Sequence, residues 1–132
     1  MTKTITQLAV LAQPHPKPNN HQPCFVQSIS WLLGKNCDDL VDGIEARKDL
    51  GLERYNVYLQ MDNGRCPIVD SFQEGLDMML YLNQEYQEKF PKTQDEDAVT
   101  QAELDEIVKD FYAIAEVTGR IAKRLKLKYE IE

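Results

Sequence analysis

The sequence predicts an α+β fold, mostly helical, in which about four helices pack on a small antiparallel sheet. Two stretches, 72–90 and 104–125, repeat apolar residues at helical spacing behind Ser/Thr-x-x-Glu capping boxes. The Asn63-Gly64 pair indicates the turn of a hairpin over about 55–70. The C-terminal residues, about 125–131, alternate apolar and charged side chains, which predicts a third strand.

The chain length and composition predict one domain over residues 1–132. A chain of 15.2 kDa buries about two-thirds of the surface that its unfolded form exposes, which is enough for one hydrophobic core. Apolar residues make up 42% and charged residues 28%, close to the averages of folded proteins, so we expect most of the chain to fold.

Residues 1–23 form an N-terminal segment that ends in a linker rich in Pro and Asn. The apolar residues of 2–12 suit a strand or a short helix equally well, because so few positions show no clear period. Over 14–21, three prolines fix φ and remove amide donors, which predicts an extended linker.

Two short helices are predicted after the linker. Pro23 suits the first turn of a helix with an apolar stripe from Phe25 to Leu33, and Gly34 suits its C-terminal end. Asn36 is then expected to cap a second helix that ends at Gly51.

The predicted hairpin has one unfavourable residue. Two-residue pairing through Asn63-Gly64 places Leu59 opposite Ile68 and gives the hairpin one apolar face. Pro67 lacks an amide donor for the ladder, so we expect a bulge or an early end to the second strand. The following helix is predicted to begin near Phe72, with Leu76, Leu80 and Phe90 in its stripe, and to stop at Pro91.

The charge distribution excludes several partners. The net charge is −7, and residues 85–110 carry nine Asp and Glu against three Lys. Such a field repels phosphate backbones and favours basic partners, so we expect no direct nucleic-acid binding. No apolar run approaches the roughly 18 residues of a membrane span, and Cys24, Cys37 and Cys66 lack the even spacing of a disulfide framework. We therefore expect reduced thiols, no membrane association and a cytoplasmic location.

Two sets of residues have the chemistry of a thiol or metal site. Cys24 begins a predicted helix, where dipole and amides favour a thiolate, but both histidines lie upstream in the linker, away from the position of a general base. His15, His21, Cys24 and Cys37 are zinc-ligand types at a spacing that matches half of the usual pattern. Metal binding by these four residues stays open, and we expect no cofactor.

Two Glu-x-x-Glu units on consecutive predicted helices provide an enzymatic alternative. Glu85 and Glu88, and then Glu103 and Glu106, each share a helix face and have the spacing to hold Mg²⁺ against a phosphate. This pattern resembles the all-α nucleotide pyrophosphohydrolases of the MazG and dimeric dUTPase kind. The resemblance implies a Mg²⁺-dependent nucleotide hydrolase, although the family has Asp where this chain has Glu106.

The preferred hypothesis is a non-catalytic protein-binding module, because motifs for catalysis are lacking and one region is strongly acidic. We expect an inhibitor or antagonist, of the physical type of immunity proteins or phage anti-defence proteins, that engages a basic surface on another protein. A structural or regulatory subunit of a complex is the remaining alternative. The expected partner-binding residues are Trp31, Tyr81, Asp95, Glu96, Asp97, Glu103, Glu106 and Asp110.

Overall fold

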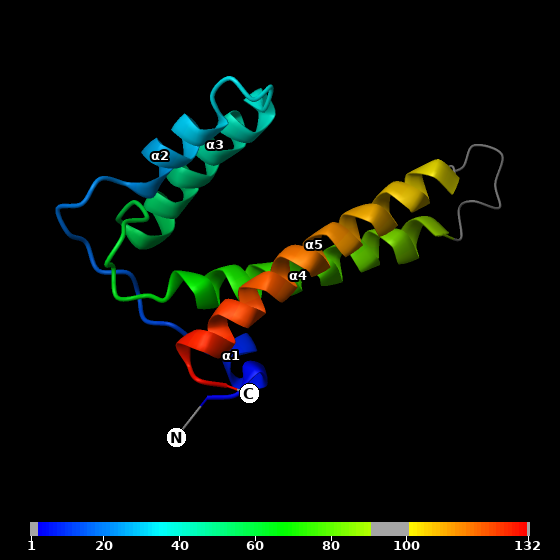
Figure 1. The fold of residues 1–132 in the computed structure, drawn as a ribbon. Helices are drawn as coiled ribbons and strands as arrows, with labels where there is room; N and C mark the ends of the chain where they lie inside the picture. The colour runs from blue at the N-terminus through cyan, green and yellow to red at the C-terminus, as the bar shows by residue number, and fades with distance from the viewer. Residues whose placement is uncertain (1–2, 91–100, 132) are drawn as a thin grey trace. The chain divides into compact units, whose positions relative to one another are not determined.

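The computed structural model describes residues 3–90 and 101–131, and within these ranges the chain forms five α-helices (Figure 1). The helices are α1 (Ile5–Ala9), α2 (Cys24–Leu32), α3 (Asp38–Tyr55), α4 (Pro67–Lys89) and α5 (Gln101–Lys128). The described ranges contain no strand, only an isolated antiparallel bridge between Pro23 and Gln60. The predicted α+β class is therefore wrong, and the fold is all-α.

The chain divides into two compact units. One comprises Met1–Ala12 with Cys66–Glu132 and contains α1, α4 and α5, whereas the other comprises Gln13–Arg65 and contains α2 and α3. This division does not test whether the units fold together, so the single domain stays a prediction.

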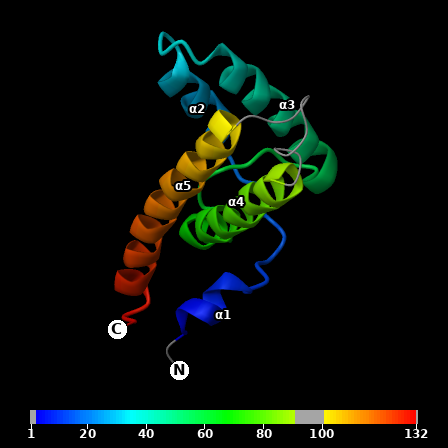
Figure 2. The same cartoon turned by 90° about the vertical axis from the view of Figure 1, so that its right-hand side faces the viewer.

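Helices α4 and α5 form an antiparallel hairpin, in which they lie side by side (Figures 1 and 2). Their contact is a seam of residues spaced alternately three and four apart, the 3.5-residue period of a coiled coil. Gly75 of α4 lies directly against Thr118 of α5. The seam consists of Ile68, Phe72, Gly75, Met79, Leu82, Tyr86 and Lys89 on α4, and Leu104, Ile107, Phe111, Ile114, Thr118, Ile121 and Leu125 on α5.

This seam corrects the stripe predicted for α4. Leu80 and Phe90, expected in the core, are 69% and 51% exposed, while Leu82 contacts α5 residues instead. A seven-residue pattern drifts by about 20° per repeat relative to a straight 3.6-residue helix. Over the length of α4 that drift carries the buried stripe away from Leu80.

Helix α1 packs on the hairpin where α4 begins and α5 ends. Thr4 and Gln7 form a capping box at its start, which resolves the open choice between strand and helix. Leu8 is fully buried in a cluster with Val69, Phe72, Ile121 and Leu125. This cluster is the main hydrophobic core of the unit.

The predicted hairpin over 55–70 is wrong. Of the predicted turn pair Asn63-Gly64 only Gly64 has a positive φ, of 88°, while Asp62, expected in a strand, has φ of 55°. The backbone of this segment bonds to the proline-rich linker. The Lys17 amide donates to the Asn63 carbonyl at 2.9 Å, and the Gln60 side chain donates to the carbonyls of Asn19 and His21. Pro67 starts α4, where a missing amide costs nothing, and this removes the second strand.

The predicted C-terminal strand over 125–131 is also wrong, because α5 continues to Lys128. Leu125 is buried in the seam while Leu127 is 81% exposed. The alternating apolar residues of this segment therefore do not share one buried face, as they would in a strand. Glu130, with φ of 53°, ends the helix, and the Ile131 amide donates to the Lys126 carbonyl at 2.8 Å. This is a Schellman motif without glycine.

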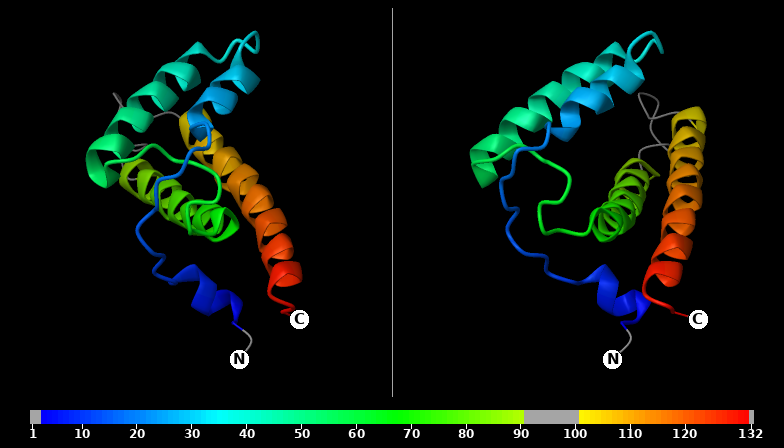
Figure 3. Two further views of the ribbon diagram at one scale, coloured as in Figure 1. Left: turned by 90° about the vertical axis from the view of Figure 1, so that its left-hand side faces the viewer. Right: turned by 60° about the vertical axis from the view of Figure 1, so that its left-hand side comes forward.

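The unit of residues 13–65 packs α2 against α3 (Figure 3). The turn after α2 uses Gly34 at φ of 76°, as expected. Helix α3 runs through Gly51, the predicted end, and stops at Asn56 in the left-handed conformation. No residue of α2 or α3 is fully buried, and Phe25 packs edge-on against Tyr58 at 5.3 Å between ring centroids.

Candidate functional site

The seam divides the outer surface of the α4–α5 hairpin into two flanks of different chemistry. Seven-residue periodicity places heptad positions e and b on one side of the seam and positions g and c on the other. The e and b side, here named the apolar flank, carries Val69, Gln73, Leu76, Leu80, Asn83, Gln87 and Phe90 on α4 and its end, and Asp105, Val108, Tyr112, Ala115, Gly119, Ala122, Lys126 and Tyr129 on α5 and its end. The distal part of the g and c side, here named the acidic flank, carries Met78, Tyr81, Glu85, Glu88, Glu103, Glu106, Asp110, Ala113 and Val117.

The acidic flank brings together four of the residues predicted to bind a partner. Tyr81 of α4 and Glu103, Glu106 and Asp110 of α5 share this flank and are all exposed. Glu85 and Glu88 add two carboxylates from α4. The structure therefore joins residues of two helices, separated in sequence, into one acidic surface.

Lys89 lies between carboxylates of this flank. Its ammonium group is 2.8 Å from Oε2 of Glu85. The hydrogen bond with Glu85 raises the pKa of Lys89 above its ordinary value, and the charges of Glu85 and Glu103 add to the effect. Lys109 lies 3.8 Å from Glu106 in a second, exposed pair. Five carboxylates against these two lysines leave the flank negative.

Exposed apolar side chains accompany the carboxylates. Tyr81 is 67% exposed, Met78 46% and Val117 41%. The register that pairs Gly75 with Thr118 places Met78 and Val117 on facing positions across the seam. Aromatic and methionine side chains are enriched in protein interfaces. The carboxylates of this flank can therefore attract a basic partner over a distance, and its apolar side chains can make contact once the partner is bound.

The other predicted partner-binding residues lie elsewhere. Trp31 is in the last turn of α2, in the unit of residues 13–65, and is 70% exposed. Asp95, Glu96 and Asp97 fall outside the described residues.

Three of the four residues considered for zinc each have a separate contact. His15 Nε2 lies 3.2 Å from the Tyr55 carbonyl, His21 Nε2 lies 3.4 Å from Asp62, and the Cys37 thiol donates to the Lys35 carbonyl. Across residues 3–90 and 101–131, no three His, Cys, Asp or Glu side chains are grouped as metal ligands.

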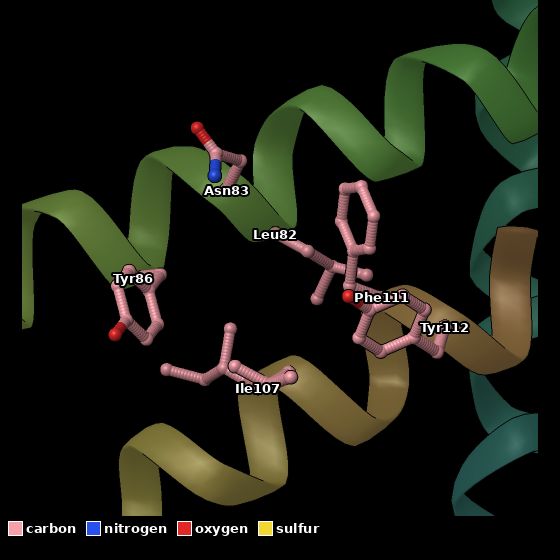
Figure 4. A pocket seen from close by; sticks show the side chains of 7 residues that line it. Leu82, Asn83, Tyr86, Ile107, Phe111 and Tyr112 are labelled. Carbon is pink, nitrogen blue, oxygen red and sulfur yellow. The ribbon is translucent and has the colours of Figure 1, made fainter.

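A groove opens at the distal end of the apolar flank and was not predicted. It has a volume of about 190 Å³ and lies between α4 and α5. Figure 4 shows Leu82 and Tyr86 of α4 facing Ile107 and Phe111 of α5 across it. We name it the distal groove; its lining is Leu82, Asn83, Tyr86, Ile107, Val108, Phe111 and Tyr112. The sequence signal that finds it is the 3.5-residue spacing of the seam.

A thiol with altered acidity lies at the start of α4. Burial opposes ionisation of Cys66, but hydrogen bonds from the Val69 amide and the Tyr129 hydroxyl, together with the charge of Lys128, lower the pKa of Cys66 below its ordinary value. Burial and the donated hydrogen bond raise the pKa of Tyr129 above its ordinary value. The two groups, 3.9 Å apart, therefore titrate together.

Comparison with protein-family models, with curated proteins and with solved structures found no match to this chain. Among the helices described, none has the length and apolar character required to cross a bilayer.

Proposed function

We propose that this chain is a non-catalytic protein-binding module, and that its acidic flank engages a basic surface on another protein as an inhibitor or antagonist. The observation that carries the proposal is the meeting of five carboxylates with exposed Tyr81 and Met78 on one side of the α4–α5 hairpin. Complementary charge speeds association, and a central aromatic side chain supplies affinity once the partners touch.

The rigid seam supports this use. The flank residues come from two helices held in register, so little conformational freedom is lost when a partner binds. Cys24, Cys37 and Cys66 form no disulfide, which favours a reducing compartment, and we place the protein in the cytoplasm as part of the same proposal.

The four glutamates of the hydrolase alternative do share the acidic flank, but their local contacts differ from those of a metal site. Glu85 binds the Lys89 ammonium group, Glu88 accepts a hydrogen bond from Gln84, and Glu106 faces Lys109. A cation within this set competes with Mg²⁺ for the carboxylates. No observation therefore favours the hydrolase over the binding module.

The test is an affinity capture with the full chain from a nuclease-treated lysate of the source organism or its natural host, washed at two salt concentrations. The informative variant is Glu103→Lys/Glu106→Lys/Asp110→Lys. Its matched control, Asp42→Lys/Glu45→Lys/Glu53→Lys, changes the net charge equally on exposed positions of α3. We expect a salt-sensitive partner to bind the wild type and the control but not the flank variant. Equal recovery by both variants contradicts the proposed site.

An antagonist must also change what its partner does. The captured partner, purified and assayed for its own activity, should be inhibited by the wild type and not by the flank variant. A partner that binds through the acidic flank without loss of activity would leave the binding module standing and exclude the antagonist.

A further inference from the structure

The seat of α1 on the hairpin has a defined set of contacts. Leu8 enters between the two helices, against Phe72 of α4 and Ile121 of α5. The Gln73 amide donates to the carbonyl oxygens of Leu8 at 3.0 Å and Leu11 at 2.8 Å, which satisfies acceptors at the end of the short helix. The apolar flank thus already binds one helix.

On α4, similar residues occupy the equivalent heptad positions two heptads toward the C-terminus. Leu82 and Tyr86 occupy the seam positions that Ile68 and Phe72 occupy below α1. Gln87 holds the heptad position of Gln73 and is exposed. Its amide now donates to Oδ1 of Asn83 on the same helix at 2.6 Å, in an exposed pair that a ligand can replace.

On α5, the same recurrence is found two heptads toward its start, as an antiparallel hairpin requires. Ile107 and Phe111 hold the seam positions of Ile121 and Leu125, and Val108 holds the flank position of Ala122. These residues, with Leu82 and Tyr86 of α4, line the distal groove. The groove therefore resembles the seat that α1 fills, except that the polar Asn83 holds the heptad position of Val69.

The apolar side chains beside this second seat are exposed among the described residues. Leu80 is 69% exposed, Tyr112 68% and Val108 38%, all on the apolar flank beside the groove (Figure 4 shows the groove). By contrast, Val69 and Leu8 in the first seat are fully buried. Burial of such side chains is the main source of affinity when a helix docks in a groove.

We propose that the distal groove binds a short amphipathic helix of a partner protein, seated as α1 is seated on the same flank. The helix presents apolar side chains at i, i+3 and i+4, as Ile5, Leu8 and Ala9 do in α1, and Gln87 donates to its last carbonyl oxygens. This surface lies on the opposite side of the seam from the acidic flank. The inference therefore goes beyond the proposed function and does not depend on it.

The negative charge around the groove favours one kind of bound helix over others. Asp105 lies on the flank beside it, and the same end of the hairpin carries the acidic flank. A helix with Lys or Arg at its edges is favoured by this field. A second copy of the chain is disfavoured, because groove-to-groove contact brings two acidic ends together.

The test uses a blocked peptide with the sequence of residues 3–12, which contains α1 and carries one positive charge. It is titrated into the ¹⁵N-labelled full chain up to about 1 mM, the weak end of specific binding. We expect saturable shifts at the amides of 82–87 and 107–112. The same peptide with Leu8→Asp is the matched control and should cause none.

Protein variants locate the site. Val108→Asp should weaken peptide binding at least about tenfold and Gln87→Ala about threefold, whereas Leu127→Asp, at an 81% exposed position on another face, should leave it unchanged. Absence of saturable binding, or shifts confined to the residues around Leu8 and Val69, overturns the proposal. A dimer in sedimentation that Val108→Asp abolishes overturns it as well, since the occupant is then a second copy.

Discussion

Gly75 lies directly against Thr118, so that a β-carbon at position 75 would be 3.0 Å from Cγ2 and 3.1 Å from Cβ of the threonine. The threonine side chain is 3% exposed, and its hydroxyl oxygen has no hydrogen-bond partner among the described residues. A small residue and a polar residue thus face each other at one layer of an otherwise apolar seam. A polar group in a seam is a known means of selecting one register, because every other register buries it against apolar side chains.

Gly75→Ala should destabilise the fold by about 1–3 kcal/mol, because overpacking of the seam outweighs the gain in helix propensity of about 1 kcal/mol. Urea unfolding followed by circular dichroism measures the change. Gly119→Ala is the control, since a β-carbon there has open space and should stabilise α5. Thr118→Ala combined with Gly75→Ala should recover much of the loss; independent, additive effects of the two changes would contradict the contact.

Thr118→Val should stabilise the protein by about 1 kcal/mol, because it removes a buried hydroxyl that lacks a partner and keeps the side-chain shape. Thermal unfolding measures this effect. If the threonine selects the register, the variant should also show broader amide signals for α4 and α5. A variant that is less stable than the wild type would show that the hydroxyl is satisfied in solution.

Leu8→Ala should release α1 from the hairpin and cost about 2–4 kcal/mol, because Leu8 is fully buried in the core cluster. Gln73→Ala should have a smaller effect, about 1–2 kcal/mol, by leaving the carbonyls of Leu8 and Leu11 without their donor. Amide exchange across residues 5–11 reports both changes. Val10→Ala is the control, because Val10 is 82% exposed and should leave exchange unaltered.

Alkylation of Cys66 should reveal its altered acidity. In a Cys24→Ser/Cys37→Ser background, the rate with iodoacetamide should reach half its maximum at a lower pH in the folded chain than in the same chain unfolded in urea, and Tyr129→Phe should move the folded midpoint upward by removing a donor to the thiolate. A midpoint that Tyr129→Phe leaves in place would exclude this hydrogen bond in solution.

The same groups make stability depend on pH. The lowered pKa of Cys66 adds stability that is fully present above the ordinary pKa of a thiol and is lost as pH falls through the folded value. The raised pKa of Tyr129 adds stability that is present below the ordinary pKa of a phenol and is lost as pH rises through its folded value. Tyr129→Phe should therefore reduce the loss of stability at high pH, measured by chemical unfolding between about pH 7 and 11.

The acidic flank predicts a kinetic effect on any partner that it captures. Glu103→Lys/Glu106→Lys/Asp110→Lys should slow association about tenfold or more at low ionic strength, because the long-range attraction is reversed. Stopped-flow or surface-binding kinetics measure the rates. The difference from wild type should shrink at about 1 M salt, where the Debye length is about 3 Å. A rate difference that does not respond to salt would indicate a contact effect instead of steering.

Local signals in the sequence located most helices correctly but not the fold class. Pro23 and Gly34 mark the limits of α2, and Pro91 follows the end of α4. Asp62 and Gly64 adopt positive φ as turn residues do, yet the turn joins no strands. Residues typical of turns predict a local backbone conformation, but they do not predict which distant segment forms hydrogen bonds with the turn. Here that segment is the linker, through Lys17 and Asn19.

The candidate surfaces also divide into features that the sequence predicts and features that only the tertiary structure reveals. Composition alone located the acidic residues, and the exposure of Trp31 and Tyr81 followed from helical wheels. The distal groove could not be found in this way, because Leu82 and Ile107 meet only when two helices are placed in one register. A 3.6-residue wheel also placed Leu80 in the core, whereas supercoiling favours Leu82.

By itself the sequence determined the positions of most helix-forming segments and the regional acidity, because each depends on neighbours within a few residues. The tertiary structure decided that the alternating C-terminal residues continue a helix and that Gly75 faces Thr118. It also decided that carboxylates of α4 and α5 meet beside Met78 and Tyr81 on one flank of the seam, while the distal groove lies on the other. These outcomes depend on packing between residues far apart in the chain, where burial of a shared apolar surface outweighs local preference.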